Sequence, residues 1–527
     1  MSPYNGEARD DVVSSQGAGA RLIVVSNRLP FVLSRKKTGE WNVQPGSGGL
    51  VNALLPVLRN RGGLWVGWTG AIDGDVGELE TALAGLTKNA GYRLKPVEIT
   101  AEERDKFYYG FSNEVIWPLF HDLQTNCNFD PAFWRVYQQV NRKFAAALRE
   151  SSEPSDFIWV HDYHLMEVAR ELRRMDVRCR LGFFLHIPFP PLDIFLKLPW
   201  RSAILRGLLE FDLIGFQTLR DRRNFLQCVR ALVKGTALHG KGQVVELELR
   251  NAQIGGVGDM EVPLSRQLRI GAFPISIDYN SFAERAASET VAKLAQYFRD
   301  NLRKRQMILG IDRLDYTKGI PNRLVAFRNA LQRFPALRQR VTLIQQVVPS
   351  REDIPEYHNL RLEIEHLVSE INGEFTEPGW VPIHYIFRSL KRDELLAYYR
   401  AADVALVTPL KDGMNLVAKE YCAAKVDDDG VLILSEFAGA AAQLQKGALL
   451  VNPHDVQAIA DRIQEAFAMT PEQARVRMRR LRRTIRETDI FWWVDSYLRA
   501  AIEKDLSAFP LVEDYDYLPE TESVLTQ

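Results

Sequence analysis

The sequence predicts an α/β protein built from two doubly wound domains. In both halves of the chain, short apolar runs rich in β-branched residues alternate with amphipathic stretches of helical length. The chain has 527 residues, 46% of them hydrophobic, which is enough for two cores in domains of roughly 200–250 residues. A proline in the segment 272–276 follows the polar region 250–269 and marks the predicted boundary. A substrate cleft is expected between the domains.

The first half begins with the apolar run 21–26, which we predict to be the first strand. Further strands are expected at 157–160, 180–185 and 211–216, with helices at 166–175 and 221–232. The second half repeats the alternation, with strands expected at 307–311, 341–347, 402–408 and 431–434, and helices at 322–333, 416–424, 439–445 and 489–506.

The predicted domains are therefore 21–271 and 272–486. Residues 1–20 are rich in Gly, Ser and Ala, and residues 507–527 are acidic without Lys or Arg, so both ends are predicted to be disordered tails.

The charge balance argues against nucleic acid and anionic membranes as partners of the whole chain. Lys+Arg and Asp+Glu both number 67, so there is no general positive field for nucleic acid or an anionic membrane. No apolar run approaches a membrane span, and residues 1–20 contain Asp10 and Asp11 but no apolar core, unlike a secretory signal. The four cysteines are widely spaced, which is typical of a reduced chain. We predict a cytoplasmic protein.

Several familiar sequence motifs are present only in part. Gly46-Ser-Gly-Gly-Leu50 lacks the third spaced glycine of a dinucleotide fingerprint, and Gly235-Thr-Ala-Leu-His-Gly-Lys241 is followed by Gly242 and a strand-like run rather than by Ser/Thr and a helix. His161 and His164 have no close-set Cys, His or acidic partners to complete a metal site. Neither a metal nor an organic cofactor is predicted.

The stretch 404–421 is the most informative part of the chain. A buried strand passes through a polar turn containing Gly413 into a helix that begins around Leu416. Unpaired amides at a helix start favour an anion such as a diphosphate, while Asp412 and Glu420 can accept hydrogen bonds from sugar hydroxyls. An ordinary turn whose aspartate caps the helix would have the same pattern, so this stretch alone leaves both interpretations open.

Other polar residues also follow predicted strands. Arg28 ends the first strand before Pro30, and Asp162 and His186 each come directly after an apolar strand. Because these strand ends share an edge of one sheet, we expect the side chains to converge on a ligand. Tyr108 and Trp117 can stack on a sugar, although core packing is the better explanation for aromatic residues taken alone.

Cations gather after strands of the second half. Arg313 and Lys318 lie in the loop between a strand and a helix, where they can neutralise a leaving diphosphate. Arg351, which follows the strand 341–347, is another candidate phosphate ligand. These residues together predict a phosphorylated sugar and a sugar nucleotide as ligands.

Six motifs in order resemble the trehalose-6-phosphate synthase family over about residues 21–506. They are Ser26-Asn-Arg-Leu-Pro30, Gly63-Leu-Trp-Val-Gly-Trp68, His161-Asp-Tyr-His164, His186-Ile-Pro-Phe-Pro190, Asp315-Tyr-Thr-Lys-Gly319 and Asp412-Gly-Met-Asn-Leu-Val-Ala-Lys-Glu420. The resemblance implies a retaining glycosyltransferase of the two-Rossmann-domain (GT-B) type. It also implies an N-terminal acceptor domain, a C-terminal nucleotide-sugar domain, and a helix in 487–506 that crosses back to the first domain.

The resemblance also implies roles for individual residues. Around glucose 6-phosphate it places Arg28, Tyr108, Trp117, Asp162 and Arg351. Around UDP-glucose it places Gly49, His186, Arg313, Lys318, Asp412, Gly413, Met414, Asn415, Leu416, Val417 and Glu420, with amides from Leu416 and Val417 and a ribose contact from Glu420. Asp162, His186, Arg313 and Lys318 would surround the reacting groups.

The implied reaction retains the α configuration of the donor glucose. No residue identifies itself as a carboxylate nucleophile, so a same-face substitution is expected, in which the departing phosphate takes the acceptor proton. The enzyme's task is then orientation and charge stabilisation, which suits Arg313 and Lys318 on the diphosphate and Arg28 on the acceptor.

Alternatives remain open at the level of the sequence. A related synthase could use glycerol 3-phosphate as acceptor, or ADP- or GDP-glucose as donor, because pocket shape decides such cases. A non-catalytic sugar-phosphate sensor would be expected to lack some charged site residues, and this chain has all of them. A homodimer or homotetramer is possible.

Overall fold

The computed structural model describes most of the chain. The described residues are 21–36, 38, 40–46, 51, 54–55, 58, 62–72, 74–87, 91–255, 263–302, 305–351, 354–503, 509 and 512–517. Gly49, the tail 1–20 and much of 507–527 lie outside these ranges, so the predictions made for them are not examined further.

The first domain is built on a nine-stranded sheet in the order β5-β4-β1-β6-β7-β8-β11-β10-β9. The seven strands from β5 to β11 run parallel, and β10 and β9 extend the edge in antiparallel fashion. The first six have the order of a Rossmann fold, third-second-first-fourth-fifth-sixth. The strands are β1 (Leu22–Arg28), β4 (Leu64–Trp68), β5 (Arg93–Pro96), β6 (Phe157–His161), β7 (Arg180–Phe184), β8 (Leu213–Phe216), β9 (Val233–His239), β10 (Val244–Ile254) and β11 (Leu264–Ala272).

Helices cover this sheet because each has one apolar face. In α5 (Pro131–Ser151), the Asp130 side chain caps the amide of Ala132, and Trp134, Tyr137 and Phe144 on one face are buried. The other helices are α2 (Val76–Thr87), α3 (Ala101–Glu103), the π-helix η1 (Arg104–Ile116), α4 (Trp117–Phe120), α6 (Val168–Arg174), α7 (Leu192–Phe195), α8 (Arg201–Leu208) and α9 (Leu219–Leu232).

The second domain has a six-stranded sheet, parallel throughout, in the order β14-β13-β12-β15-β16-β17. This is again the Rossmann order, with the switch point between β12 and β15. The strands are β12 (Gln306–Arg313), β13 (Val341–Val348), β14 (Ile383–Phe387), β15 (Val404–Val407), β16 (Val431–Ser435) and β17 (Leu449–Val451). The helices are α10 (Tyr279–Ala287), α11 (Glu289–Asn301), α12 (Ile320–Arg333), α13 (Pro355–Phe375), α14 (Arg392–Ala401), α15 (Leu416–Ala424), α16 (Ala441–Leu444), α17 (Val456–Ala468) and α18 (Pro471–Glu487).

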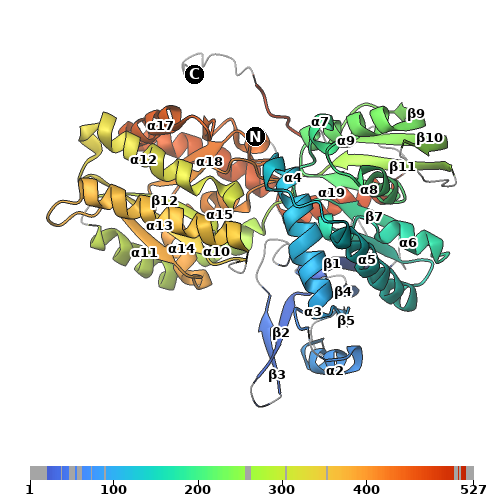
Figure 1. Cartoon of the computed structure of the whole chain (residues 1–527). Helices are drawn as coiled ribbons and strands as arrows, with labels where there is room; N and C mark the ends of the chain where they lie inside the picture. Colours follow the sequence, from blue (N-terminus) through green and yellow to red (C-terminus); the bar gives the residue numbers. More distant parts are fainter. Residues whose placement is uncertain are drawn as a thin grey trace, which may run out of the picture.

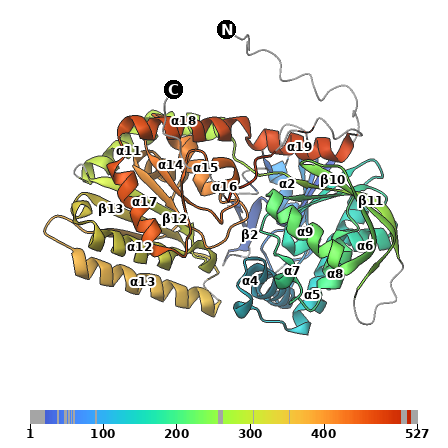
Figure 2. The ribbon, with the colours of Figure 1, turned by 90° about the horizontal axis from the view of Figure 1, so that it is seen from above.

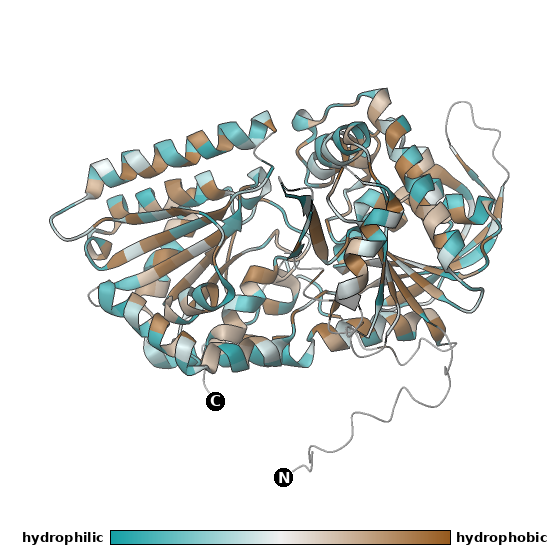
Figure 3. Cartoon of the chain, turned by 90° about the horizontal axis from the view of Figure 1, so that it is seen from below, coloured by the Kyte–Doolittle hydropathy of each residue, from teal (hydrophilic) through white to brown (hydrophobic). Residues whose placement is uncertain are grey.

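The two domains lie side by side with their sheets flanked by helices (Figure 1). The strands of both sheets are mostly hydrophobic, whereas the outer helices also present polar faces (Figure 3). The predicted fold class, two doubly wound Rossmann-like domains, is confirmed.

The final helix, α19 (Ile490–Ile502), leaves the second domain and packs on the first, against strands β8 and β11 (Figure 2). Its Trp493 donates a hydrogen bond to the carbonyl of Phe273 at 3.1 Å, and its Tyr497 hydroxyl donates to the carbonyl of Phe183 at 3.0 Å. Both side chains are fully buried, so the helix completes the first domain's core.

Three features differ from the simple alternation read in the sequence. The polar stretch after Gln243 begins the strand β10, which pairs with β11 in antiparallel fashion, and β2 (Phe31–Arg35) pairs with β3 (Trp41–Pro45) as a separate hairpin. The aromatic segment before Trp117 is the π-helix η1. Residues 512–517 contact the protein through Asp514 on Arg223 and Glu513 on Lys446, whereas their composition predicted disorder.

Candidate active site

The acceptor side of the predicted site begins at Arg28, the last residue of β1. Its guanidinium lies over the ring of Trp68, 3.8 Å from the centroid, and 5.5 Å from the ring of Tyr108. Burial lowers the pKa of Arg28, while the neighbouring Tyr108 opposes that shift. The aromatic rings therefore hold a largely desolvated cation at the sheet edge, ready for an anion.

A second cation reaches the same place from the other domain. Arg351, in a left-handed backbone conformation with φ of 51°, lies 4.8 Å from the ring centroid of Trp117. It also donates a hydrogen bond to the Tyr357 hydroxyl at 2.7 Å. Burial raises the pKa of Tyr108, but Arg351 and Arg28 together lower it below its usual value, which indicates that both cations act on that ring.

Asp162 and His186 meet at the ends of the neighbouring strands β6 and β7. The backbone of Asp162 is left-handed, with φ of 76°, and its carboxylate accepts a hydrogen bond from the His186 amide at 3.2 Å. Burial raises the pKa of Asp162 to about 7, while Arg313 and Arg351 oppose the shift. This contact joins the Asp162 side chain to the backbone of His186, so the ends of the two strands lie together.

The ring of His186 is neutral and paired. Its Nε2 lies 3.1 Å from Nδ1 of His161, and burial lowers the pKa of His186 to about 3 and that of His161 well below its usual value. One ring therefore donates and the other accepts. His186 cannot carry charge at neutral pH, so it can only bind a ligand through neutral hydrogen bonds.

The donor side is built on the loop between β15 and α15. Lys318 Nζ lies 2.6 Å from Asp412 Oδ2, and the Asn415 amide donates to the same oxygen at 3.2 Å. Burial would raise the pKa of Asp412, but Lys318 holds it below its usual value, so the carboxylate is ionised. The chain thus presents a charged pair at the switch point of the second sheet.

Gly413 brings this loop against the first domain. A Cβ atom at this position would collide with the carbonyl oxygen of His186. Only glycine permits this approach, which places Asp412 next to the His186 end of β7. Met414 is buried behind the loop and accepts a hydrogen bond from the Ala440 amide at 2.8 Å.

Helix α15 begins at the predicted residue. Asn415, with φ of 72°, caps the amide of Ala418, so Leu416 and Val417 occupy the first two helical positions, whose amides have no intrahelical acceptor. Glu420, on the next turn, accepts a hydrogen bond from the Tyr399 hydroxyl at 2.8 Å, and burial raises its pKa. The first two amides of the helix are therefore available to an anion, as at other helix starts.

Arg313 ends β12 and is exposed. Its charge lowers the pKa values of both Asp162 and Tyr108, so it faces the acceptor side as well as the Lys318 loop. Arg313 and Arg351 of the second domain therefore lie near Asp162 and Tyr108 of the first. Gly49, also predicted for the site, is outside the described residues.

Sequence reasoning missed three contributors. Trp68 supports Arg28, and Asp315 lies 4.0 Å from Arg351, yet both were only parts of motifs without an assigned role. Tyr357 binds Arg351 from the start of α13, where nothing in the sequence distinguishes it from an ordinary helical residue. A tyrosine whose hydroxyl accepts a hydrogen bond looks, in the sequence of an amphipathic helix, like any other tyrosine.

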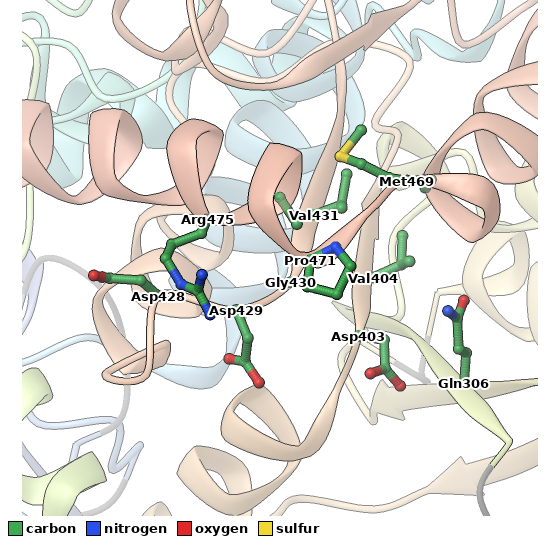
Figure 4. Close-up of a pocket in the computed structure, with 12 residues that line it drawn as sticks. Gln306, Asp403, Val404, Asp428, Asp429, Gly430, Val431, Met469, Pro471 and Arg475 are labelled. Carbon is green, nitrogen blue, oxygen red and sulfur yellow. The ribbon is translucent and has the colours of Figure 1, made fainter.

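A separate cavity of about 180 Å³ lies at the opposite, amino-terminal edge of the second sheet, lined by residues that include Asp403, Val431 and Arg475 (Figure 4). Its carboxylates are already engaged: Asp403 accepts from the Met307 amide, and Asp428 pairs with Arg479. Ligands of doubly wound sheets bind at the carboxyl ends of the strands, so this cavity is not the predicted site.

Within the described residues, no group of three or more His, Cys, Asp or Glu side chains is placed to hold a metal ion, and no helix combines the length and apolar character of a membrane span.

Comparison with known proteins gives a consistent result. The model of glycosyltransferase family 20 matches residues 20–503. Trehalose-6-phosphate synthase of Mycobacterium avium (strain 104) is 42% identical over 504 residues, covering 95% of this chain and 99% of that protein. The corresponding protein of Mycobacterium tuberculosis (strain ATCC 25618 / H37Rv) is 42% identical over 501 residues, covering 95% and 98%.

Solved structures agree. An α,α-trehalose-phosphate synthase (UDP-forming) from Burkholderia xenovorans in complex with glucose-6-phosphate matches with a TM-score of 0.80 at 33% identity, covering 92% of this chain and all of that one. A trehalose-6-phosphate protein from E. coli bound with UDP-2-fluoro glucose matches with a TM-score of 0.78 at 34% identity, covering 92% and 99%. The family expected from the six motifs is confirmed, and the chain belongs to glycosyltransferase family 20.

Proposed function

We propose that this glycosyltransferase transfers glucose from UDP-glucose to glucose 6-phosphate with retention, giving α,α-trehalose 6-phosphate and UDP. The observation that carries the proposal is that two cations from different domains, Arg28 and Arg351, both lie beside Tyr108, with Arg351 also against Trp117. The charged Lys318–Asp412 pair lies at the switch point of the second sheet. Relatives that cover nearly the whole chain carry the name of this activity.

The acceptor phosphate binds between Arg28 and Arg351 in this proposal. Each guanidinium can donate two hydrogen bonds to a phosphate in a fork. Tyr108 and Trp117 contact the sugar, and Asp162 accepts from its hydroxyl groups next to the reacting centre. The Burkholderia xenovorans protein, whose structure contains glucose-6-phosphate, supports this choice of acceptor.

The donor binds at the start of α15. Leu416 and Val417 offer amides to the diphosphate together with Arg313 and Lys318, the 413–415 loop lines the site, and Asp412 accepts from donor glucose hydroxyls. Glu420, already oriented by Tyr399, holds the ribose. His186 contributes neutral hydrogen bonds to the glucose.

The reaction breaks the bond between the donor's anomeric carbon and the diphosphate oxygen and forms a bond to the anomeric oxygen of the acceptor on the same face. The acceptor proton moves to the departing phosphate oxygen. Arg313 and Lys318 stabilise the negative charge that develops on the diphosphate, and the ionised Asp412 keeps Lys318 in place. The two domains hold the sugars in contact, and this orientation of the reacting atoms lowers the barrier to the reaction.

The test is release of UDP from UDP-glucose with glucose 6-phosphate, with the product identified by mass and by anomeric NMR. Expected is an α,α-linked disaccharide phosphate. Parallel reactions contain glycerol 3-phosphate or ADP- and GDP-glucose, and turnover only in one of these would replace the proposed substrate pair. Ligand binding without any turnover would instead indicate a sensor.

We also propose a cytoplasmic location. All four cysteines are free, and Cys179, Cys228 and Cys422 are buried, as expected for a chain in a reducing compartment. The oligomeric state, for which a dimer or tetramer is proposed, can be measured by light scattering.

A further inference from the structure

Helix α4 and the two residues after it lie where the acceptor and donor sides meet. We call residues 117–122 the α4 turn. At its start, the Trp117 ring lies under Arg351 of the second domain. At its end, Asp122 forms an ion pair with Lys411, which directly precedes Asp412. One short segment of the first domain thus touches both sides of the site in the second domain.

His121 is the inward-facing residue of this turn. It is only 3% exposed, and its ring centroid lies 4.3 Å from that of Trp117. Its Nδ1 lies 2.7 Å from the Trp117 carbonyl oxygen, which can only accept a hydrogen bond, so Nδ1 carries the proton. Burial lowers the pKa of His121 to about 4, so the ring is neutral at pH 7 and Nε2 is left as an acceptor.

The electrostatic neighbours of this ring belong to the other domain. Asp315, Lys318 and Asp412 all act on the pKa of His121, after the larger effects of burial and of the hydrogen bond to Trp117. A neutral imidazole whose Nε2 accepts a hydrogen bond suits a lysine ammonium, whereas a second cation would repel it. His121 lies in the same turn as Asp122, whose partner Lys411 directly precedes Asp412, and this contact brings the turn to the boundary beside the Lys318–Asp412 pair.

We propose that His121 is a positioning residue that holds the donor-side Lys318–Asp412 pair from the acceptor domain, with the Asp122–Lys411 ion pair fixing the contact. This inference rests on the proposed function. Its consequence is a coupling of the two ligands: an acceptor that fixes Trp117 and Arg351 also fixes His121, and so prepares the donor site. Glucose 6-phosphate should then tighten the binding of UDP.

The experiment measures the dissociation constant of UDP by calorimetry, with and without saturating glucose 6-phosphate. We expect a tightening of about fivefold or more in the wild type. His121→Phe, which keeps the ring shape but has neither nitrogen, should reduce the tightening to less than about twofold. His121→Gln, whose amide reaches the position of Nε2, should restore part of it. A purely structural role would not produce this rescue.

Two further variants make the test decisive. Asp122→Asn removes only the ion pair of a partly exposed side chain, and so tests the contact even if His121→Phe fails to fold. In this variant glucose 6-phosphate should tighten UDP binding less than in the wild type.

His366→Phe is the matched control, because His366 is exposed on α13 and pairs with Glu370. Wild-type coupling in both His121→Phe and Asp122→Asn would overturn the inference, as would a wild type that binds both ligands without coupling. A wild type that binds neither ligand would instead reject the proposed function.

Discussion

Asp162 is the titratable residue at the site with the most unusual setting. Its left-handed backbone directs the carboxyl between the ends of β6 and β7, and burial raises its pKa to about 7 from an unfolded value near 3.8. Between these two values the folded state retains a proton that the unfolded state has released. Asp162 therefore lowers the stability progressively as the pH rises from about 4 to about 7.

The substitution Asp162→Asn tests this linkage. The variant should be about 1–3 kcal/mol more stable than the wild type at pH 8, and the difference should shrink towards pH 4. Denaturant unfolding of both proteins at pH 4, 6 and 8 measures it. A difference that does not change with pH would show that Asp162 titrates normally. Turnover should fall, because the neutral amide of asparagine accepts hydrogen bonds through one oxygen only, whereas an ionised carboxylate accepts them through two.

Lys318→Ala and Arg313→Ala test the diphosphate site. Each should lower kcat/KM by about a hundredfold or more, because charge stabilisation at the leaving group is lost. In Lys318→Ala the pKa of Asp412 should also rise, since Lys318 is the main group that lowers it. UDP release by folded variants provides the measurement. Near-normal turnover would remove these residues from the mechanism.

The control for these two variants is Lys293→Ala. Lys293 is 75% exposed on α11 and pairs only with Glu289 among the interactions described for it, so removing it should leave turnover unchanged.

At the scale of elements, the β15–α15 loop depends on Gly413. A Cβ there meets the His186 carbonyl oxygen, so Gly413→Ala should push the loop away from the first domain and lower kcat/KM at least tenfold. The loss of thermal stability should be smaller than the loss of activity, because the loop can shift into the cleft. Gly373→Ala on α13 is the matched control, since its Cβ would have nothing within 4 Å. Equal activity in the two variants would contradict the close-approach argument.

Helix α19 attaches the end of the chain to the first domain. The buried Tyr497 hydroxyl donates to the Phe183 carbonyl and lies 3.3 Å from the Leu213 carbonyl, at the junction of β7 and β8. Tyr497→Phe should cost about 1–2 kcal/mol of unfolding free energy, because carbonyl groups lose their partner in a dry environment. Tyr297→Phe, at a position that is 60% exposed, should change stability little in the same denaturation experiment. A loss no larger in Tyr497→Phe than in the control would show that water or backbone rearrangement replaces the bond.

At the scale of the whole molecule, the proposed acceptor site is shared between the domains. The resemblance implies an N-terminal acceptor domain but also places Arg351 at the acceptor, and Arg351 reaches Trp117 from the second domain. Contact between the domains is therefore part of forming the proposed phosphate site.

Arg351→Ala should accordingly raise the KM for glucose 6-phosphate about tenfold or more while leaving the dissociation constant of UDP within about threefold. Steady-state kinetics and calorimetry separate the two quantities. Arg462→Ala, a surface change on α17, serves as control. Equal weakening of both ligands in Arg351→Ala would mean that Arg351 supports the domain arrangement rather than the acceptor alone.

Much of the fold could be predicted because the relevant signals are local. Helix α15 spans 416–424 as expected, and polar residues placed directly after apolar strands, such as Asp162 and His186, do meet. Neighbouring parallel strands end at the same edge of a sheet, so their carboxyl ends lie together however the rest of the chain folds. The π-helix η1 and the antiparallel strand β9 escaped prediction, since neither has a distinctive local periodicity, whereas the strand-like run after Gly242 does form β10.

The sequence by itself determined the strand and helix alternation, the two domains and the residue types at each strand end. The sequence determines these features because periodicity, turn residues and helix caps act over only a few residues. Only the tertiary structure decided which strand ends face each other across the cleft. The approach of Gly413 to His186, of Arg351 to Trp117 and of Lys411 to Asp122 joins residues far apart in the chain. Such contacts depend on how two cores are oriented, and no local pattern encodes that orientation.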